Sequence, residues 1–213
     1  MGMVKITDIK LSMEAVLKKL HMEDPDDDDL ELIEEMLESS YRIACPKAFY
    51  KKCSVEIKDG LVVIDGVTIP SEFVAEKLAG QEFAYPYCMT SGTELDEWAD
   101  GYTDFSENYF ADQIKELYLA KAGAALRAEI NETVGKCSSL NPGSLKEWPI
   151  SGQKELFEIL GKGCCGISLK ESWLMVPEKS GSGIFYRTDS GFENCSLCPR
   201  ENCPNRRAEY VGK

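Results

Sequence analysis

The segment Leu61-Val62-Val63-Ile64-Asp65-Gly66-Val67-Thr68-Ile69 carries the clearest fold signal in the chain. Its two short apolar stretches are rich in β-branched residues and flank Asp65-Gly66, a dipeptide typical of two-residue hairpin turns. A second turn signal, Asp59-Gly60, precedes the segment, and residues 54–57 alternate between polar and apolar side chains before it. Strands joined by such short turns pair antiparallel. The sequence therefore predicts an antiparallel meander of three strands.

Helices and further strands extend outward from this meander. A short helix is predicted to open at Pro70-Ser71-Glu72 and to stop at Gly80, because Ser is a favoured N-cap and Gly a favoured helix end. Further elements are predicted as strands near 83–89, 136–139, 166–169 and 183–187 and as a helix at 151–160. Strands and helices mix without a regular alternation. We therefore expect an α+β fold, a twisted antiparallel sheet with flanking helices.

Apolar residues at helical spacing predict three longer helices. Two lie near the N-terminus, one starting at Leu11-Ser12 and one containing Leu30 and Tyr41, and we interpret the acidic residues 24–29 between them as a solvated linker. The third runs from about 106 to 134 and is expected to pack on the sheet. Its apolar face changes from bulky to small residues in the order Phe110, Ile114, Leu117, Tyr118, Ala122, Ala125. That taper predicts that another element approaches its C-terminal half closely.

Composition limits the class of protein. The chain has 213 residues, of which 43% are hydrophobic, so it can bury a sizeable core. Its net charge of -13 argues against binding to nucleic acid, which requires a basic surface. No apolar stretch approaches the roughly 18 residues of a membrane span, and residues 1–10 lack the apolar core of a signal peptide. We therefore expect a cytoplasmic protein that does not enter membranes.

The chain is predicted to have three parts. Residues 1–44 are expected to form an N-terminal helical segment, residues 45–190 the α+β domain, and residues 191–213 a cysteine-rich tail that binds metal. The nine cysteines cannot all pair, and a reducing cytoplasm disfavours disulfides. His21 is the only histidine, which excludes a histidine general base elsewhere in the chain.

The tail contains the pattern C-x2-C-x4-C-P, formed by Cys195, Cys198 and Cys203. Two thiolates separated by two residues can bind one metal centre from a single turn, and a third nearly completes a tetrahedral set. The tail alone lacks a fourth cysteine ligand. Cys137 is the first candidate for it, with Cys164 or Cys165 as alternatives. The remaining cysteines are interpreted as small buried apolar side chains: Cys45, Cys53 and Cys88.

Two segments in the C-terminal half resemble a known family. The first is Ser138-Ser139-Leu140-Asn141-Pro142-Gly143-Ser144, followed by Trp148-Pro149 and a helix. The second is Ile167-Ser168-Leu169-Lys170-Glu171-Ser172-Trp173-Leu174-Met175-Val176-Pro177, followed by Ser182-Gly183. In order and spacing they are similar to the S-adenosylmethionine-binding activation domain of cobalamin-dependent methionine synthase, with its Arg-x-x-Pro-Gly-Tyr loop and its Leu-x-Glu-Ser-x-x-Met-x-Pro…Ser-Gly strand pair. The resemblance covers residues 45–187.

The resemblance implies the activation-domain fold and a role in the reductive reactivation of a corrinoid (vitamin B12). In that reaction cobalt(II) accepts one electron and is then trapped by the methyl group of S-adenosylmethionine. The chain has no recognisable corrinoid-binding histidine motif, so the corrinoid is expected on a partner, a corrinoid protein or a corrinoid methyltransferase. Because the reduction needs an electron source, an iron–sulfur cluster is favoured over zinc in the tail. The residues implied to lie at the ligand site are Ser139, Pro142, Gly143, Glu171, Ser172, Phe185 and Tyr186.

Three residues depart from the family pattern. Ser139 stands where the family has arginine, Ser144 stands where a tyrosine follows the Pro-Gly pair, and Phe185 replaces a tyrosine of the ligand site. The missing guanidinium would offer a fixed fork of donors to the ligand's carboxylate. Two functions therefore stay open. One is an accessory activator that binds S-adenosylmethionine, and the other is a non-catalytic metal-binding interaction module of corrinoid methyl-transfer metabolism.

Overall fold

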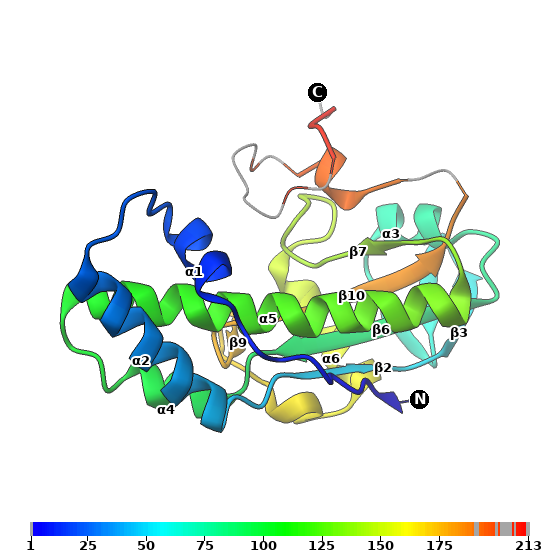
Figure 1. Cartoon of the computed structure of the whole chain (residues 1–213). Helices are drawn as coiled ribbons and strands as arrows, with labels where there is room; N and C mark the ends of the chain where they lie inside the picture. Colours follow the sequence, from blue (N-terminus) through cyan, green and yellow to red (C-terminus); the bar gives the residue numbers. More distant parts are fainter. Residues whose placement is uncertain (1, 190–191, 199, 201–205, 207, 212–213) are drawn as a thin grey trace.

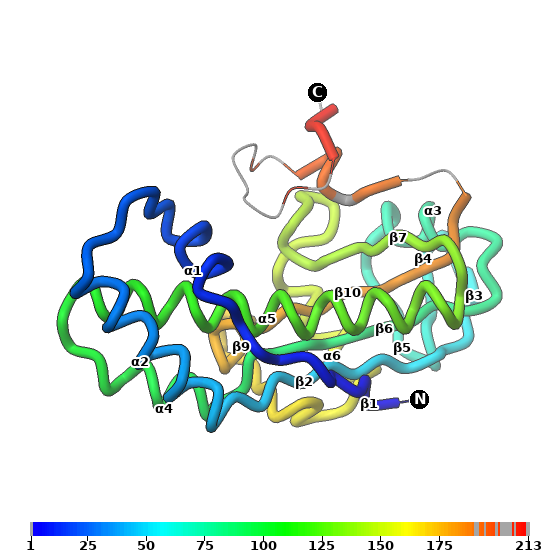
Figure 2. The backbone as a smooth tube through the Cα atoms, in the orientation of Figure 1, coloured from blue at the N-terminus to red at the C-terminus, as the bar shows by residue number. Residues whose placement is uncertain are grey.

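The computed structural model describes residues 2–189, 192–198, 200, 206 and 208–211, and Figure 1 shows their arrangement. Within these residues an eight-stranded antiparallel sheet forms the centre of the molecule, and helices cover both of its faces. The smooth tube in Figure 2 follows the chain from the N-terminal helices through the sheet to the tail. The expected α+β fold, with a twisted antiparallel sheet and flanking helices, is confirmed.

Strand β6 (Phe83–Thr90) is the central strand of the sheet. On one side it pairs with β10 (Ser180–Arg187), which pairs in turn with β7 (Cys137–Leu140). On the other side it pairs with both β2 (Lys47–Tyr50) and β3 (Cys53–Lys58). Successive residues of a strand point to opposite faces. Each face of β6 therefore contributes to a different core.

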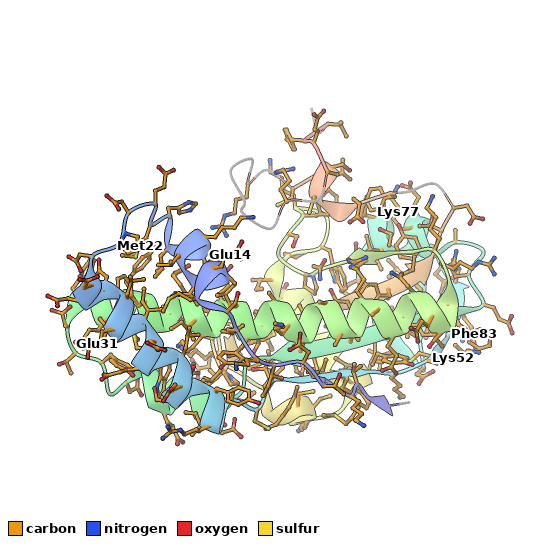
Figure 3. All side chains as sticks on the ribbon, in the orientation of Figure 1. Glu14, Met22, Glu31, Lys52, Lys77 and Phe83 are labelled. Atoms are coloured by element: carbon orange, nitrogen blue, oxygen red, sulfur yellow. The ribbon has the colours of Figure 1, made fainter. Side chains whose placement is uncertain are left out.

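Strands β2 and β3 pair with β6 in the same register, and the ladder of hydrogen bonds is interrupted between them, opposite Pro86. Lys51, between the two strands, donates its N–H to the carbonyl of Pro86 at 3.0 Å. Proline has no N–H with which to return the bond, so the ladder breaks at this position. Strand β2 was not predicted from the sequence, because it has only four residues and follows directly after Pro46. At the far end of β6, the ammonium of Lys52 lies 3.6 Å from the ring centroid of Phe83 (Figure 3).

The predicted meander is present. β3 pairs with β4 (Leu61–Ile64), and β4 pairs with β5 (Val67–Ile69). The Asp65 carboxylate accepts a hydrogen bond from the N–H of Ser54 at 3.0 Å and lies 2.8 Å from the ammonium of Lys51. That ammonium holds the pKa of Asp65 below its usual range. The turn is therefore tied to the strand that it faces. At the other end of the β2–β3 strand, the two-residue strand β1 (Gly2–Met3) pairs with β2.

Helix α5 (Phe105–Val134) crosses the front of the sheet in Figure 1 and joins two cores. Its 30 residues span about 45 Å, and the Asp104 carboxylate accepts hydrogen bonds from two N–H groups of its first turn. The N-terminal half of α5 packs against α1 (Met13–Leu20), α2 (Asp27–Ile43) and α4 (Thr93–Ala99). Its C-terminal half packs on the sheet, where Leu126 and Ile130 contact tyrosines of β2 and β6.

The opposite face of the sheet is covered by α3 (Glu72–Leu78) and α6 (Gln153–Leu160). A short helical turn, η1 (Ile150–Gly152), leads into α6, and a second, η2 (Cys164–Gly166), lies against β2 and β6 after it. A separate two-stranded hairpin, β8 (Ser168–Leu169) with β9 (Met175–Val176), precedes β10. The core on this face includes Val62, Ile64, Leu78, Cys88, Leu156 and Ile184.

The acidic run was interpreted wrongly as a linker over its second half. The Asp26 carboxylate accepts a hydrogen bond from the N–H of Asp29 at 2.9 Å and caps α2, whose first turn contains three further aspartates. Carboxylates near a helix N-terminus are stabilised by the helix dipole and by free N–H groups. The run therefore starts the helix. Tyr41, one of the residues whose helical spacing predicted α2, is 48% exposed. In the part of the chain that the structure describes, no helix is long and apolar enough to cross a membrane.

Gly183 allows a close approach between β10 and the start of the loop after β7. A Cβ placed on Gly183 would lie 2.5 Å from Nδ2 of Asn141 and 2.9 Å from Oη of Tyr87, and closer still to the carbonyl oxygen of Leu140. The side chain of Asn141 occupies this space, where it donates to Tyr87 Oη at 2.6 Å and to the carbonyl of Ser182 at 2.7 Å. Close packing therefore explains why glycine occupies position 183 in the Ser-Gly dipeptide of the second sequence block.

We predict that Gly183→Ala lowers the free energy of unfolding by about 1 to 3 kcal/mol, because the backbone carbonyl of Leu140 cannot move aside cheaply. Thermal and urea unfolding followed by circular dichroism measure the effect. Gly2→Ala is the matched control, since a Cβ there meets no atom within 4 Å. Equal stability of both variants would contradict the proposed reason for glycine at position 183.

Candidate functional site

A hollow of about 620 Å³ lies between the C-terminal half of α5 and strand β10, and we call it the α5–β10 hollow. Ligand pockets of small molecules typically measure about 300 to 1,000 Å³. Aromatic, sulfur-containing and charged side chains meet there with small residues of the helix. The lining includes Tyr87, Met89, Ala120, Gly123, Ala124, Arg127, Glu178, Lys179, Ser180, Phe185 and Arg200.

The hollow exists because α5 carries small residues where it passes β10. Ala120, Gly123 and Ala124 leave space beside the helix that larger side chains would fill. Met89 lies against this stretch, since a Cβ on Gly123 would be only 3.2 Å from its sulfur. The taper of α5 was expected to allow another element to approach its C-terminal half closely, and strands β2, β6 and β10 contact this helix. A hollow remains over part of the small-residue stretch.

Two stacked aromatic rings and a guanidinium lie together on the lining. The rings of Tyr87 and Phe185 stack with centroids 4.4 Å apart, and the guanidinium carbon of Arg127 lies 5.2 Å from the Phe185 centroid. Directly opposite Phe185 on β7 is Ser139. Residues opposite each other in an antiparallel pair face the same side of the sheet. Arg127 therefore brings a guanidinium from α5 to the face of the sheet on which Ser139 lies.

The loop after β7 is connected to the hollow through Asn141. Its hydrogen bond to Tyr87 Oη joins the residue before Pro142 to one of the stacked rings. Within the loop, the N–H of Gly143 donates to the carbonyl of Trp148 at 2.8 Å, and the N–H of Ser144 donates to the carbonyl of Asn141 at 3.2 Å. These two amides are therefore used in hydrogen bonds inside the loop.

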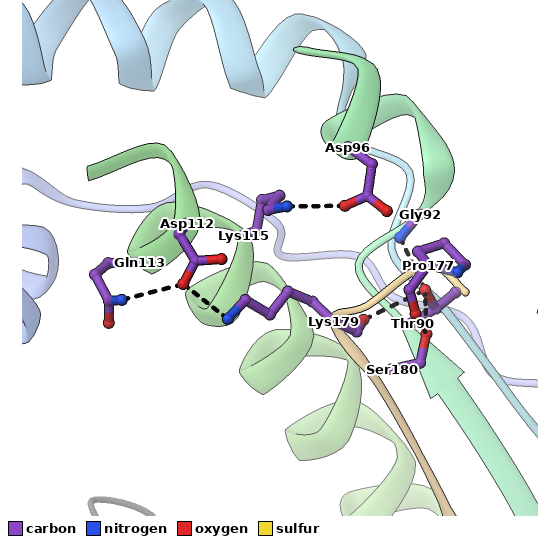
Figure 4. A network of polar contacts seen from close by, with 9 residues as sticks. All are labelled: Thr90, Gly92, Asp96, Asp112, Gln113, Lys115, Pro177, Lys179 and Ser180. Atoms are coloured by element: carbon purple, nitrogen blue, oxygen red, sulfur yellow. Dashed lines mark hydrogen bonds and ion pairs between the residues drawn. The ribbon is translucent and has the colours of Figure 1, made fainter. Parts of the chain in front are cut away.

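A polar network fixes the rim of the hollow where β10 begins (Figure 4). The Lys179 ammonium lies 2.8 Å from the Asp112 carboxylate of α5, and the Ser180 hydroxyl donates to the carbonyl of Pro177 at 2.7 Å. The oxygen of the same hydroxyl lies 3.0 Å from Thr90 Oγ1 at the end of β6, within hydrogen-bond distance. Helix α5, strand β6 and strand β10 are thus held together at this rim. In an adjacent ion pair, the Lys115 ammonium of α5 lies 2.9 Å from the Asp96 carboxylate of α4 and so joins the two helices.

The other residues implied by the resemblance are distributed differently. Tyr186 points to the opposite face from Phe185 and is 3% exposed, and burial raises the pKa of its phenol. Glu171 and Ser172 are exposed in the turn between β8 and β9. The next residue, Trp173, has a φ of 65° and lines a second hollow of about 680 Å³ beside α6. The structure therefore brings Ser139 and Phe185 together, whereas Tyr186 lies across the sheet.

The first cysteine of the tail lies close to β7. Cys195 is part of the short helical turn η3 (Asn194–Ser196), which packs against β7, the strand that carries Cys137. Cys198 is half-buried, and Cys203 lies outside the described residues. Burial raises the pKa of Cys137, and the nearby Arg127 guanidinium opposes this shift. Of the three proposed fourth ligands, only Cys137 is on the strand that η3 contacts.

Cys164 and Cys165 belong to a different group, on the other face of the sheet. Their sulfurs and that of Cys88 all lie within 4.8 Å of one another, and Cys88 donates its S–H to the Cys164 sulfur at 3.1 Å. Hydrogen bonds from Cys165 and Cys88 lower the pKa of Cys164. The hydrogen bond between Cys165 and Cys164 raises the pKa of Cys165. The interpretation of Cys88 as an ordinary apolar side chain was incomplete, and Cys45 is exposed instead of buried.

Sequence reasoning missed Tyr87, Met89 and Arg127. Tyr87 and Met89 were recognised only as parts of a strand. Arg127 follows a run of small residues on α5. Small residues leave space beside a helix, so a cation next to them is the one signal in the sequence that could have indicated a ligand contact. Its proximity to Phe185 depends on packing between residues far apart in the chain.

Comparison with solved structures supports the architecture. The crystal structure of the MetH reactivation domain bound to AdoHcy is similar to this chain, with a TM-score of 0.61 and a sequence identity of 14%. The similarity covers 90% of this chain and 80% of that one. No family model matches the chain, and no curated protein does. The chain thus has the fold of the activation domain that its two sequence blocks resemble.

Arg206 holds the described part of the tail together. Its guanidinium donates to the carbonyls of Cys195, Cys198, Arg200 and Ala208. We predict that Arg206→Lys makes the tail more sensitive to limited proteolysis by chymotrypsin, because an ammonium cannot span these four acceptors. The melting temperature of the main domain should stay unchanged. Arg42→Lys, which alters only an exposed ion pair with Glu38, is the control, and equal cleavage of both variants would refute the bracing role.

Proposed function

We propose that this protein binds S-adenosylmethionine in the α5–β10 hollow and acts as an accessory activator of a corrinoid protein. The carrying observation is the guanidinium of Arg127, 5.2 Å from the ring centroid of Phe185 and on the face that Ser139 shares. In the family that the sequence resembles, an arginine at the position of Ser139 helps to hold the ligand. Arg127 offers the same fork of donors from α5.

The chemistry of the hollow suits this ligand. The stacked rings of Tyr87 and Phe185 offer an apolar surface for an adenine ring or for the methionine chain. Arg127 and Arg200 bring positive charge that can engage a carboxylate, whereas the Lys179 ammonium is already paired with Asp112. Glu178 brings negative charge, which suits the positively charged sulfonium of S-adenosylmethionine. The MetH reactivation domain, which shares this fold, was solved with AdoHcy bound.

In this proposal the residues of the chain bind and orient the methyl donor, and the corrinoid is the substrate. A partner protein would carry the corrinoid, as the resemblance implies. Positioning a reactant accounts for much of what a protein contributes to cofactor chemistry. The hollow is open toward solvent along α5, so a docked partner could reach a ligand that lies in it. Transfer of the methyl group leaves AdoHcy, so the hollow should bind both forms.

The first test is calorimetry with S-adenosylmethionine and AdoHcy on the wild type, Arg127→Gln and Glu178→Gln. Arg127→Gln should weaken both ligands by roughly 10- to 100-fold, because a charge-assisted hydrogen bond contributes about 1.5 to 3 kcal/mol. Glu178→Gln should weaken S-adenosylmethionine more than AdoHcy, because only the former carries a sulfonium charge. Arg42→Gln, whose side chain pairs with Glu38 on α2, should bind like the wild type.

Two results would count against the proposal. Equal affinities of the wild type and Arg127→Gln would place the ligand outside the α5–β10 hollow. No heat with either ligand at millimolar concentration would favour the second candidate, a metal-binding interaction module that kept the fold and lost the ligand. The replacements at Ser139, Ser144 and Phe185 are the observations that favour this second candidate.

We further propose that the tail holds an iron–sulfur cluster on Cys195, Cys198 and Cys203, with Cys137 as the fourth ligand. The contact of η3 with β7 supports Cys137 over Cys164 and Cys165. Little apolar sequence is available in the tail, so bound metal should supply much of its order. The triple variant Cys195→Ser/Cys198→Ser/Cys203→Ser should lose iron and acid-labile sulfide after anaerobic purification. The main domain should remain folded while the tail becomes sensitive to protease.

Cys45→Ser, at an exposed thiol, is the matched control and should keep full iron and sulfide. Full iron content in the triple variant would locate the cluster elsewhere. A protein that stays free of iron after anaerobic reconstitution, but loses one zinc ion per chain in the triple variant, would identify zinc as the tail metal.

A further inference from the structure

We propose that Cys88, Cys164 and Cys165 form a binding site for one Zn²⁺ ion, separate from the tail. Cys88 is on the central strand β6, and the other two belong to η2 on the face opposite to the α5–β10 hollow. In the part of the chain that the structure describes, these residues are the one group of three metal-ligand side chains whose donor atoms come together. The site is independent of the proposed function.

The spacing of the sulfurs suits a single ion. All three lie within 4.8 Å of one another, and those of Cys88 and Cys164 are 3.1 Å apart. With Zn–S bonds of about 2.3 Å at tetrahedral angles, two sulfur ligands of one ion lie about 3.8 Å apart. Small side-chain rotations reach this arrangement. Thiolates that bind different irons of a cluster must lie farther apart, so the group favours one ion over an iron–sulfur cluster.

The backbone of η2 has an unusual conformation that aims both neighbouring thiols at β6. Cys165 has a φ of 55° and a ψ of 16°, in the left-handed region that residues other than glycine rarely adopt. Gly163 and Gly166 on either side also have positive φ, of 73° and 77°. In an extended strand, adjacent side chains point to opposite sides. The tight left-handed turn removes this alternation, and strain of this kind is characteristic of functional sites.

Charge and access also favour an ion. Cys88 is fully buried, whereas Cys164 and Cys165 are half-buried, so an ion can enter from the surface and keep a fourth position toward solvent. Three thiolates and one Zn²⁺ carry a net charge of -1. Lys47 on β2, whose ammonium also pairs with Glu94 at 3.4 Å, lies close enough to stabilise the thiolate of Cys165. Its ammonium would therefore offset part of the remaining charge of the loaded site.

The chemistry of binding is an exchange of protons for the ion. Zn²⁺ binds thiolates, so loading the site releases the thiol protons of the three cysteines, and three Zn–S bonds replace the S–H···S contact between Cys88 and Cys164. An ion bound in this way would fasten η2, and the end of α6 before it, to the central strand. A site with three protein ligands leaves one coordination position for water or for an incoming ligand.

The experiment uses the full-length chain in which the three tail cysteines are already serine, so that metal in the tail does not contribute. The protein is reduced, freed of metal and titrated anaerobically with Zn²⁺, and separately with Co²⁺ as a spectroscopic substitute. We expect about one Zn²⁺ per chain after gel filtration, and thiolate-to-Co²⁺ charge-transfer bands with the visible bands of tetrahedral cobalt. Adding Cys164→Ser or Cys165→Ser should abolish stoichiometric Zn²⁺ binding and the cobalt bands.

Cys88→Ser is a weaker test, because a buried replacement can prevent folding. The half-buried Cys164 and Cys165 avoid this difficulty, and Cys45→Ser should bind like its parent. Three outcomes would overturn the proposal: no Zn²⁺ bound by the parent chain, unchanged binding after Cys164→Ser, or bound iron with acid-labile sulfide at this group. Mass spectrometry that finds a Cys88–Cys164 disulfide in anaerobically purified protein would overturn it too. A failed S-adenosylmethionine titration would not affect this result.

Discussion

The two-residue period of strand β6 is the constraint on which the rest of the structure depends. Tyr85, Tyr87 and Met89 point toward α5, and Ala84, Cys88 and Thr90 point toward the face that α6 covers. Because β6 has partners on both edges, a shift of its register by one residue would exchange these two sets. The stacked rings of the hollow and the buried thiol would then change faces together. Neighbouring residues of β6 therefore belong to two groups on opposite faces of the sheet, the lining of the α5–β10 hollow and the group of Cys88, Cys164 and Cys165.

Helix α5 forms the α5–β10 hollow on the face of the sheet that carries Tyr87 and Phe185. Its first half has bulky residues and joins the N-terminal helices in one core, and its second half has small residues where it passes β10. A uniformly bulky helix would fill the space above Phe185. A uniformly small one would lose the core around Phe110, Ile114 and Tyr118. The α5–β10 hollow results from combining both compositions in one rigid element, and Arg127 is held at its edge by the same helix.

Local signals predicted the fold well, and contacts between distant residues account for what was missed. Asp65-Gly66 predicts its hairpin because the two paired strands directly flank the turn. Helix α5 is predicted from the helical spacing of its own apolar residues. Strand β2 is short and flanked by Pro46, and it exists because β6 pairs with it. The Cys88–Cys164 contact joins residues 76 positions apart, so no spacing pattern reveals it. Ser139 and Phe185 were found through the resemblance, whereas Arg127 reaches them only through packing.

The described part of the tail reaches the α5–β10 hollow. Arg200 lines the hollow, and its carbonyl accepts a hydrogen bond from Arg206, which also binds the carbonyls of Cys195 and Cys198. The conformation that gathers these carbonyls is therefore the one in which Arg200 lines the hollow. Anything that stabilises it, including metal on the tail thiols, would lower the cost of binding an anionic ligand group in the hollow. By thermodynamic linkage, a ligand that engages Arg200 would stabilise the metal-bound tail to the same extent.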